Sequence, residues 1–516
     1  MTHLRKRMLE ELQRLRSRRL FVHVMGSAFV GNNLTRPSKH QDILISPERQ
    51  ELTGQRRDVN IQHAYSRSAA VAKSRTRGLA SMGIRERLSF LLVASFSCIS
   101  VISAQVVPAA DRDVEVLRRQ GFVAYNANYL ELRRERIRRA ASLGRRVFQM
   151  EAHGQKTICA HQILTETKWL LGDTADFRRI DLRLDALENV LDHPDLEDIA
   201  TRQDQSDGSW GRCYTEWFFK LDASYEHLNQ EATRDLRPDL RLLFLDRINS
   251  PAKLRNYFAR VSVSDIARDG VDHSRELNES MANLMRLILW DRPKGFQWDP
   301  RLKRVLMDIV LHRLRNPETG WWGERYVVDG RTEFVDYLSL TFHIVRYLDG
   351  NIPELQRMIE TTLAFKDLNE PPGWLSDGRF TDHNNMDVAV LFRFGWRAAN
   401  DGQRQAMVAQ IQKMLDWCLT QSLQADGTFA QGGDDSIEEN TYFGVAFLSR
   451  IGFFDRNRRF WTTRDFPEAL EVRQRITSYI LQHKGSGAAG GAYYEHALGE
   501  LNSDAAYLKS SERHPE

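Results

Sequence analysis

The chain has 516 residues, of which 42% are hydrophobic, so it is long enough to bury a sizeable core in one to three domains. Its formal net charge of +4 is unevenly spread: residues 1–81 hold 16 Lys and Arg against 6 Asp and Glu, a balance of +10, and residues 82–516 therefore carry −6. The basic segment has neither interleaved aromatic residues nor a recognition helix, which argues against a nucleic-acid partner.

The first 14 residues, MTHLRKRMLEELQR, resemble the first helix of phage-integrase core-binding domains. The resemblance ends there, and the catalytic Arg, His and Tyr set that it implies does not follow. We therefore interpret residues 1–14 as a remnant or a reading-frame artefact. Residues 1–81 as a whole are predicted to be a basic extension that is disordered or that precedes the true start of translation.

An export signal follows at an internal position. After Met82 come two Arg, an uncharged apolar stretch at 88–102 and two small residues that end at Ala104. This order is typical of a secretory signal peptide, here at 82–104. Two other interpretations stay open: a membrane anchor at 88–109, and a buried core helix. With a signal peptide or an anchor, the residues that follow lie outside the cytoplasm, secreted or periplasmic.

Cysteine usage limits the metal chemistry. Cys98 falls within the apolar stretch, and Cys159, Cys213 and Cys418 are widely spaced without a CxxC motif. That spacing excludes a metal site built of Cys ligands. It allows one disulfide, whose partners the sequence does not identify, or buried free thiols.

A glycine-centred turn recurs six times between residues 200 and 490. The glycines are Gly208, Gly270, Gly320, Gly373, Gly427 and Gly487, spaced by 62, 50, 53, 54 and 60 residues. Polar residues and then an apolar run of helical period follow each turn, which predicts a repeated helical hairpin. The aromatic residue that often follows the glycine is predicted to pack between neighbouring hairpins. Residues 105–203 are predicted to be a helical region that packs on the repeats.

In wording and period, residues 204–510 resemble the (α/α) toroids of six-hairpin glycosidases, polysaccharide lyases and terpenoid cyclases. The resemblance implies an all-α fold, an (α/α) toroid or barrel of about six helical hairpins, with activity in the loops at its mouth. An open helical solenoid is the alternative. The cyclase chemistry is doubtful because Gly432 stands where the first Asp of the D-x-D-D motif is needed.

The loops after the turns carry the residues that we expect to act chemically, since loops placed by a rigid scaffold hold most functional groups. The predicted catalytic residues are Asp336, Tyr337, His383, Asn384 and Asp387, and the predicted substrate-binding residues are Trp321, Trp322, Glu324, Arg325, Arg379, Asn385, Glu438, Asn440 and Tyr442. No metal site is predicted, although Asp434 and Asp435 are weak candidates for calcium ligands, and no other cofactor is expected. The second loop adds Asp272, His273, Glu276 and Asn278.

Structural interpretations stand beside these functional ones. Asp and Asn before an apolar helix suit N-caps, the two Trp suit a plug between hairpins, and the acids of the fifth loop suit a solvated surface. His343, within an apolar helix, suits a hydrogen-bonded core histidine better than a catalyst.

The predicted function is an exported carbohydrate-active enzyme. A glycoside hydrolase would use Asp336 and Asp387 as general acid and as base or nucleophile. A uronate polysaccharide lyase would neutralise the substrate carboxylate with Asn384 and Arg325 and abstract a proton with His383 or Tyr337. The alternatives are a non-catalytic binding or scaffold protein at the cell surface and a terpenoid-cyclase-like enzyme.

Overall fold

The computed structural model describes residues 114–153, 155–199, 202–229, 240–293, 296–430, 436–483 and 490–502. All of them belong to the larger of the two compact units into which the chain divides. The predictions for residues 1–81, for the signal or anchor at 82–109 and for Asp434 and Asp435 therefore lie outside the described residues. Within the described part, no helix is both long and apolar enough to cross a membrane.

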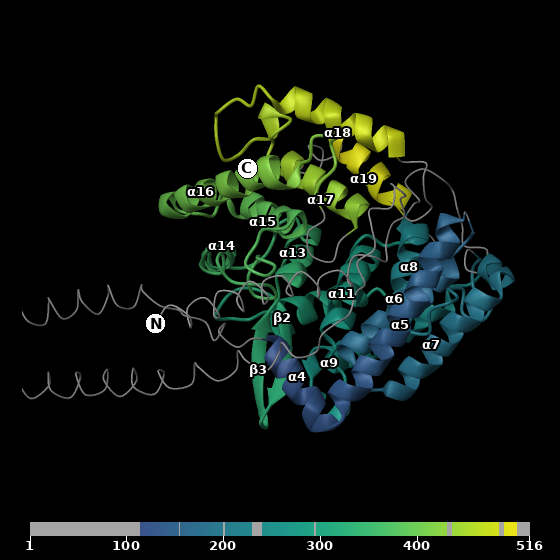
Figure 1. Cartoon of the computed structure of the whole chain (residues 1–516). Coiled ribbons are helices and arrows are strands. Elements are labelled where there is room, and N and C mark those ends of the chain that lie inside the picture. Colours follow the sequence, from purple (N-terminus) through teal and green to yellow (C-terminus); the bar gives the residue numbers. More distant parts are fainter. Residues whose placement is uncertain are drawn as a thin grey trace, which may run out of the picture. The chain divides into compact units, whose positions relative to one another are not determined.

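Sixteen α-helices make up most of the described residues, which confirms the prediction of a mainly helical protein (Figure 1). The first are α4 (Val114–Tyr125), α5 (Tyr129–Ala152), α6 (Ile158–Asp173) and α7 (Phe177–Asp192), followed by the 3₁₀ helix η3 (Pro194–Ile199) and α8 (Trp217–Asn229). Next come η5 (Leu243–Arg247), α9 (Pro251–Val261), β1 (Val263–Ser264), α10 (Ile266–Asp269), α11 (Ser274–Leu289), α12 (Leu302–Asp308), the π-helical turn η6 (Ile309–Arg313), β2 (Gly323–Val328) and β3 (Arg331–Asp336). The last are α13 (Leu338–Tyr347), α14 (Leu355–Ala364), α15 (Asp382–Gly395), α16 (Asp401–Trp417), η7 (Cys418–Ser422), α17 (Ile437–Arg450), η8 (Arg456–Arg458), α18 (Ala469–His483) and α19 (Gly490–Asn502).

Six helices, α8, α11, α13, α15, α17 and α19, form a series in which each packs against the next; we call it the inner series. Of the helices between them, α9 and α12 pack against α11, α14 against α15, and α18 against α19. Burial separates the two sets: α15 buries 11 of its 14 residues, whereas α16 buries five of 17 and α18 three of 15. A helix buried nearly all round is covered on every side, whereas a single apolar stripe leaves the other face in solvent. This alternation agrees with the predicted helical hairpins.

Two of the predicted glycine turns share one hydrogen-bond pattern. Gly208 N donates to Asp204 O and Gly320 N donates to Asn316 O, both at 2.8 Å. In each turn the first residue's own N–H also donates to the carbonyl oxygen of the residue after the glycine, at 2.7 Å. Both glycines have positive φ angles, 75° and 76°, which residues with a Cβ rarely adopt. At Gly208 and Gly320 the repeat in the sequence is therefore also a repeat of backbone conformation, whereas Gly373 lacks a positive φ and Gly427 N donates to a residue three positions back.

A comparison of two Gly→Ala variants tests why the first turn needs glycine. A Cβ at Gly208 would lie 2.1 Å from Arg241 O, whereas at Gly330, with a nearly equal φ of 73°, it would meet nothing within 4 Å. Gly330→Ala should cost about 1 kcal/mol of unfolding free energy for the left-handed backbone alone. Gly208→Ala should cost at least about 2 kcal/mol more, because the clash adds to that strain. Equal losses in denaturant titrations would show that the close approach to Arg241 does not matter.

A three-stranded sheet interrupts the helices where the sequence predicted a loop. β2 pairs in parallel with β1 and antiparallel with β3, so Gly323 faces Asp336 and Val328 faces Arg331. Asp329 and Gly330 form the two-residue turn between β2 and β3, with φ angles of 50° and 73°. An Asp-Gly pair between alternating residues is a strong hairpin signal, because both turn positions need positive φ. Glu324, Arg325 and Asp336 thus lie on strands and not in a loop, which corrects that prediction.

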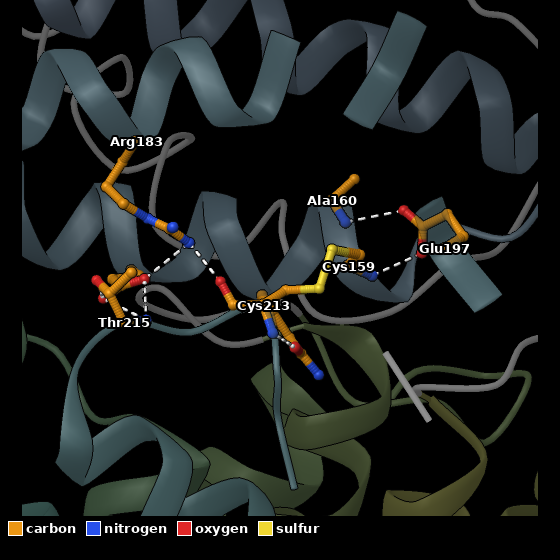
Figure 2. The surroundings of a disulfide bond; sticks show 8 residues. Cys159, Ala160, Arg183, Glu197, Cys213 and Thr215 are labelled. Carbon is orange, nitrogen blue, oxygen red and sulfur yellow. Dashed lines mark hydrogen bonds and ion pairs between the residues drawn. A yellow bond between two sulfur atoms is a disulfide. The ribbon is translucent and has the colours of Figure 1, made fainter. Parts of the chain in front are cut away.

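The two N-terminal cysteines of the described part form a disulfide. Cys159, in the first turn of α6, bonds to Cys213, 54 residues later, while Cys418 is free and buried. Figure 2 shows the disulfide and the side chains that hold the backbone on either side of it. On one side Glu197 accepts hydrogen bonds from Cys159 N (2.6 Å) and Ala160 N (2.9 Å), and on the other Arg183 donates to Cys213 O (2.6 Å). The bond therefore fixes the start of α6 to the loop before α8.

Removing this disulfide should lower the free energy of unfolding by about 2–4 kcal/mol, since the reduced chain gains the entropy of an open loop. The Cys159→Ser/Cys213→Ser variant should melt at a lower temperature than the parent and should no longer respond to a reductant. Cys418→Ala is the matched control and should keep the parent's sensitivity to reductant. A parent protein that melts at one temperature with and without reductant would contradict the bond.

Candidate functional site

The two tryptophans of the third loop are fully buried, so neither ring can stack on a sugar. Trp321 Nε1 donates to Met358 O and Thr362 Oγ1, both on α14 and at 3.2 Å. Trp322 Nε1 donates to Val310 O at 2.7 Å. Because both indole N–H groups are satisfied inside the protein, the structure matches the alternative prediction of a plug between hairpins.

The Asp336 carboxylate stabilises the Gly320 turn through two hydrogen bonds. It accepts them from Thr319 Oγ1 (2.8 Å) and Asn316 Nδ2 (3.2 Å), and the residue is 7% exposed. Burial raises the pKa of Asp336 to about 6, and the two hydrogen bonds oppose that rise. This position joins β3 to the turn and leaves the carboxylate little access to a substrate.

Glu324 is part of a buried ion-pair cluster, the Arg118 cluster, formed by Arg118, Asp173, Asp272, Glu324 and Tyr326. Arg118 Nε lies 2.5 Å from Asp272 Oδ2, and the same guanidinium pairs with Asp173. Tyr326 Oη donates to Asp272 Oδ2 at 3.1 Å. Burial, and then the negative charge of Asp272, raise the pKa of Glu324 well above its ordinary value. The cluster connects α4 to the end of α6 and to β2.

The two predicted arginines also lie away from a common site. Arg325, on β2, donates to Arg313 O at 2.7 Å and lies 5.1 Å from the ring centre of Phe334. Arg379 is exposed in a short turn that its backbone closes with Ser376.

The polar run at the start of α15 is mostly structural. The N-cap is Thr381, whose Oγ1 accepts a hydrogen bond from Asn384 N at 3.2 Å. The Asn384 side chain donates to Trp374 O at 3.1 Å. Asn384, Asn385 and Asp387 are each at most 4% exposed. Only His383 of this run keeps an accessible surface, with its ring stacked on Phe443 at 3.9 Å.

A similar division holds at the start of α17. Ser436 is the N-cap, and Asn440 Nδ2 donates to Ser436 O at 2.9 Å. Asn440 and Glu438 are buried, and burial raises the pKa of Glu438. Tyr442 stays half-buried, 5.8 Å from the ring of His496 on α19.

The partly exposed Tyr337, His383 and Tyr442 belong to a group of polar side chains on the inner series. We call it the inner cluster; its members are Asp222, Glu279, Arg286, Tyr337, His343, Tyr347, His383, Asp387 and Tyr442. Glu279 of α11 interacts electrostatically with His383 of α15 and with Tyr337. Tyr347 of α13 interacts in the same way with Asp387 of α15 and with Tyr442 of α17. Side chains from α11, α13, α15 and α17 therefore lie within electrostatic range of one another.

Glu279 is the member of the inner cluster that the sequence analysis missed. Its side chain is 35% exposed, and its Oε1 lies 3.9 Å from Arg275 Nε. Burial, followed by the negative charge of Asp222, raises the pKa of Glu279 from 4.5 to about 7, against the opposing charges of Arg275 and Arg286. The available signal was a polar stripe, Arg275, Glu279 and Arg286, on an otherwise buried helix.

Asp222 is the second carboxylate of this arrangement. It lies on α8, which packs against α11, and it is exposed. Its Oδ1 accepts a hydrogen bond from the buried Asn283 Nδ2 at 2.9 Å, which fixes its orientation. Two interacting carboxylates, one of them with a pKa near neutrality, can take the roles of acid and base in one reaction.

His343 remains a neutral histidine. Its Nδ1 lies 3.1 Å from Tyr347 Oη, and the two rings are stacked. Burial, and then the positive charges of Arg286 and Arg346, lower its pKa well below 6.5. This agrees with the expected hydrogen-bonded histidine, although the residue is half-buried and lies in the inner cluster.

In the described part of the chain, no group of three or more His, Cys, Asp or Glu side chains is arranged to hold a metal ion. Comparison with known proteins adds no further identification: no protein-family model matches the chain, and neither a curated protein nor a solved structure does so.

Proposed function

We propose that the protein is a glycoside hydrolase that acts in the inner cluster, with Glu279 as general acid and Asp222 as the second carboxylate. The observation that carries the proposal is the pairing of these two carboxylates on adjacent helices of the inner series, among tyrosine, histidine and arginine side chains. A pair of carboxylates, one acting as acid and the other as base or nucleophile, performs the reaction in most glycosidases.

The chemistry follows from the state of each group. Glu279, protonated below pH 7, donates its proton to the glycosidic oxygen as the bond to the anomeric carbon breaks. Asp222, an acceptor held by Asn283, either removes a proton from the attacking water or attacks the anomeric carbon itself. Tyr337 stays protonated, because burial and the nearby Glu370 and Glu279 raise its pKa, so it can donate a hydrogen bond to the sugar.

The lyase mechanism has less support. It needs an amide and a guanidinium to neutralise the substrate carboxylate, and the predicted groups were Asn384 and Arg325. Asn384 is buried and donates to Trp374 O, and Arg325 lies on β2 with a hydrogen bond to Arg313 O. Both side chains are thus engaged in hydrogen bonds within the protein, so we favour hydrolysis.

The proposal includes the fold and location expected from the sequence. The inner series, with helices packed alternately against it, supports an (α/α) toroid of about six hairpins. The Cys159–Cys213 disulfide supports action outside the cytoplasm, since such bonds persist in oxidising compartments.

Incubation of the full-length protein with neutral and uronic-acid oligosaccharides tests the reaction. New reducing ends without absorbance from an unsaturated bond are the expected products. Absorbance would instead establish a lyase. Binding without either product across all substrates would overturn the hydrolase and favour the scaffold alternative.

A further inference from the structure

Arg286 is held rigidly at the end of α11. Its Nε donates to Ala282 O at 3.1 Å, and its Nη2 donates to Asn283 Oδ1 at 2.8 Å. The guanidinium carbon lies 3.6 Å from the ring centre of Tyr225 and 5.3 Å from that of Tyr347. Two hydrogen bonds and two aromatic rings thus fix the plane of a half-buried cation.

The same guanidinium has no carboxylate within ion-pairing distance among the described residues, unlike several other arginines with low exposure. Arg118 pairs with Asp272, Arg183 with Glu166 at 2.8 Å, and Arg450 with Glu500. A partly buried cation that makes no close ion pair is costly, and an anion bound from outside would offset that cost.

The donors left on Arg286 suit a planar anion. A guanidinium has five N–H donors, and the recorded hydrogen bonds use one on Nε and one on Nη2. Two hydrogens on Nη1 and one on Nη2 are left, so this end of the guanidinium can offer a fork of donors to the two oxygens of a carboxylate.

The position of Arg286 connects this fork to the proposed acid. Arg286 follows Glu279 by seven residues on α11, so the two lie on one face and about 10 Å apart along the helix axis. Asn283, which accepts from Arg286, also donates to Asp222. One amide therefore fixes both the arginine and the second carboxylate.

We propose that Arg286 binds the carboxylate of a uronic-acid residue, so that the substrate of the inner cluster is an acidic oligosaccharide. This inference rests on the proposed function for its location in an active site. The anion binding itself requires no turnover, and it can therefore be measured whether or not the protein hydrolyses sugars.

Calorimetry on the full-length Glu279→Gln protein is the test, with trigalacturonate, its carboxyl-reduced neutral counterpart and a sulfated trisaccharide as probes. Trigalacturonate should bind best, and Arg286→Met should weaken that binding about 10- to 100-fold, the range for a charged hydrogen-bond pair. Affinity for the neutral trisaccharide should stay within about twofold. Arg286→Lys should fall between parent and Arg286→Met, because it keeps the charge and loses the fork.

Arg304→Met, at an exposed position of α12, is the matched control and should bind like the parent. The inference would be overturned if the parent bound the acidic and neutral probes equally, or if a folded Arg286→Met protein bound them as the parent does. A preference for the sulfated probe would mean that Arg286 binds a sulfate and not a carboxylate. Uronate-selective binding without hydrolysis of any substrate would instead reject the proposed function and keep the anion site. Hydrolysis of neutral sugars with no uronate preference would reject the anion site and keep the proposed function.

Discussion

Glu279→Gln should lower kcat/KM for the oligosaccharide substrate about 100- to 10,000-fold, the usual contribution of a general acid. The amide keeps the size of the side chain but has no proton to donate at any pH. The parent's activity should fall as pH rises through about 7, because Glu279 then loses its proton. A pH–rate profile of parent and variant measures both effects. A variant with parental activity would exclude Glu279 as the acid.

Stability should change in the opposite direction in the same variant. The pKa of Glu279 is raised from 4.5 to about 7 in the folded protein, so the folded state binds this proton more tightly than the unfolded chain does. The resulting stabilisation is present below pH 4.5 and is lost as pH rises through 7. Glu279→Gln removes that loss, so the variant should gain stability relative to the parent between pH 5 and pH 8. Glu360→Gln, exposed on α14, should change neither activity nor this pH dependence.

Arg118→Met should lower the free energy of unfolding by about 3–5 kcal/mol, the typical cost of leaving buried charges without a partner. Asp272 is fully buried and Asp173 is 8% exposed, and Arg118 is the cation that pairs with both. Arg119→Met, the neighbouring and half-exposed arginine of α4, is the matched control and should cost little. Urea titrations of both variants measure the difference.

The loss in Arg118→Met should depend on pH. Burial raises the pKa of Asp173 to about 6, and the charge of Arg118 keeps it from rising further. A raised carboxyl pKa means that stability is lost as pH rises from 3.8 through 6, and removing Arg118 extends that loss to higher pH. The destabilisation should therefore be larger at pH 8 than at pH 5. Arg118→Met/Asp272→Asn should recover part of it, and equal costs at both pH values would exclude charge as the cause.

The sequence predicted the helical part of this fold well where the signal was local. Gly208 and Gly320 marked turns because only glycine suits their backbone, and the apolar runs marked α13 and α15. The sheet was missed although Asp329 and Gly330 carried its signal, because the surrounding charged residues were interpreted as a loop. The turn residues were thus sufficient to predict the turns at Gly208 and Gly320, and Asp329 and Gly330 would have been sufficient to predict the hairpin.

The candidate site was harder to predict for a physical reason. The dense polar runs, such as the one around Asn384, were predicted to hold the site, but the side chains of such a run at a helix start are mostly used for capping or are buried. The inner cluster instead takes one or two residues from each of several helices, such as Asp222 from α8 and Glu279 from α11. Nothing in a single sequence shows that Asp222 and Glu279, 57 positions apart, interact in the folded protein.

The turn that recurs at Gly208 and Gly320 has a consequence for how the chain folds. Its hydrogen bonds join residues no more than five positions apart, so a hairpin can begin to form as soon as its own residues are free to move. The Cys159–Cys213 bond instead joins segments 54 positions apart, whose contact requires a much longer loop to close. A reduced chain should therefore build its hairpins in parallel from local nuclei, and oxidation should secure an arrangement that local contacts have already selected.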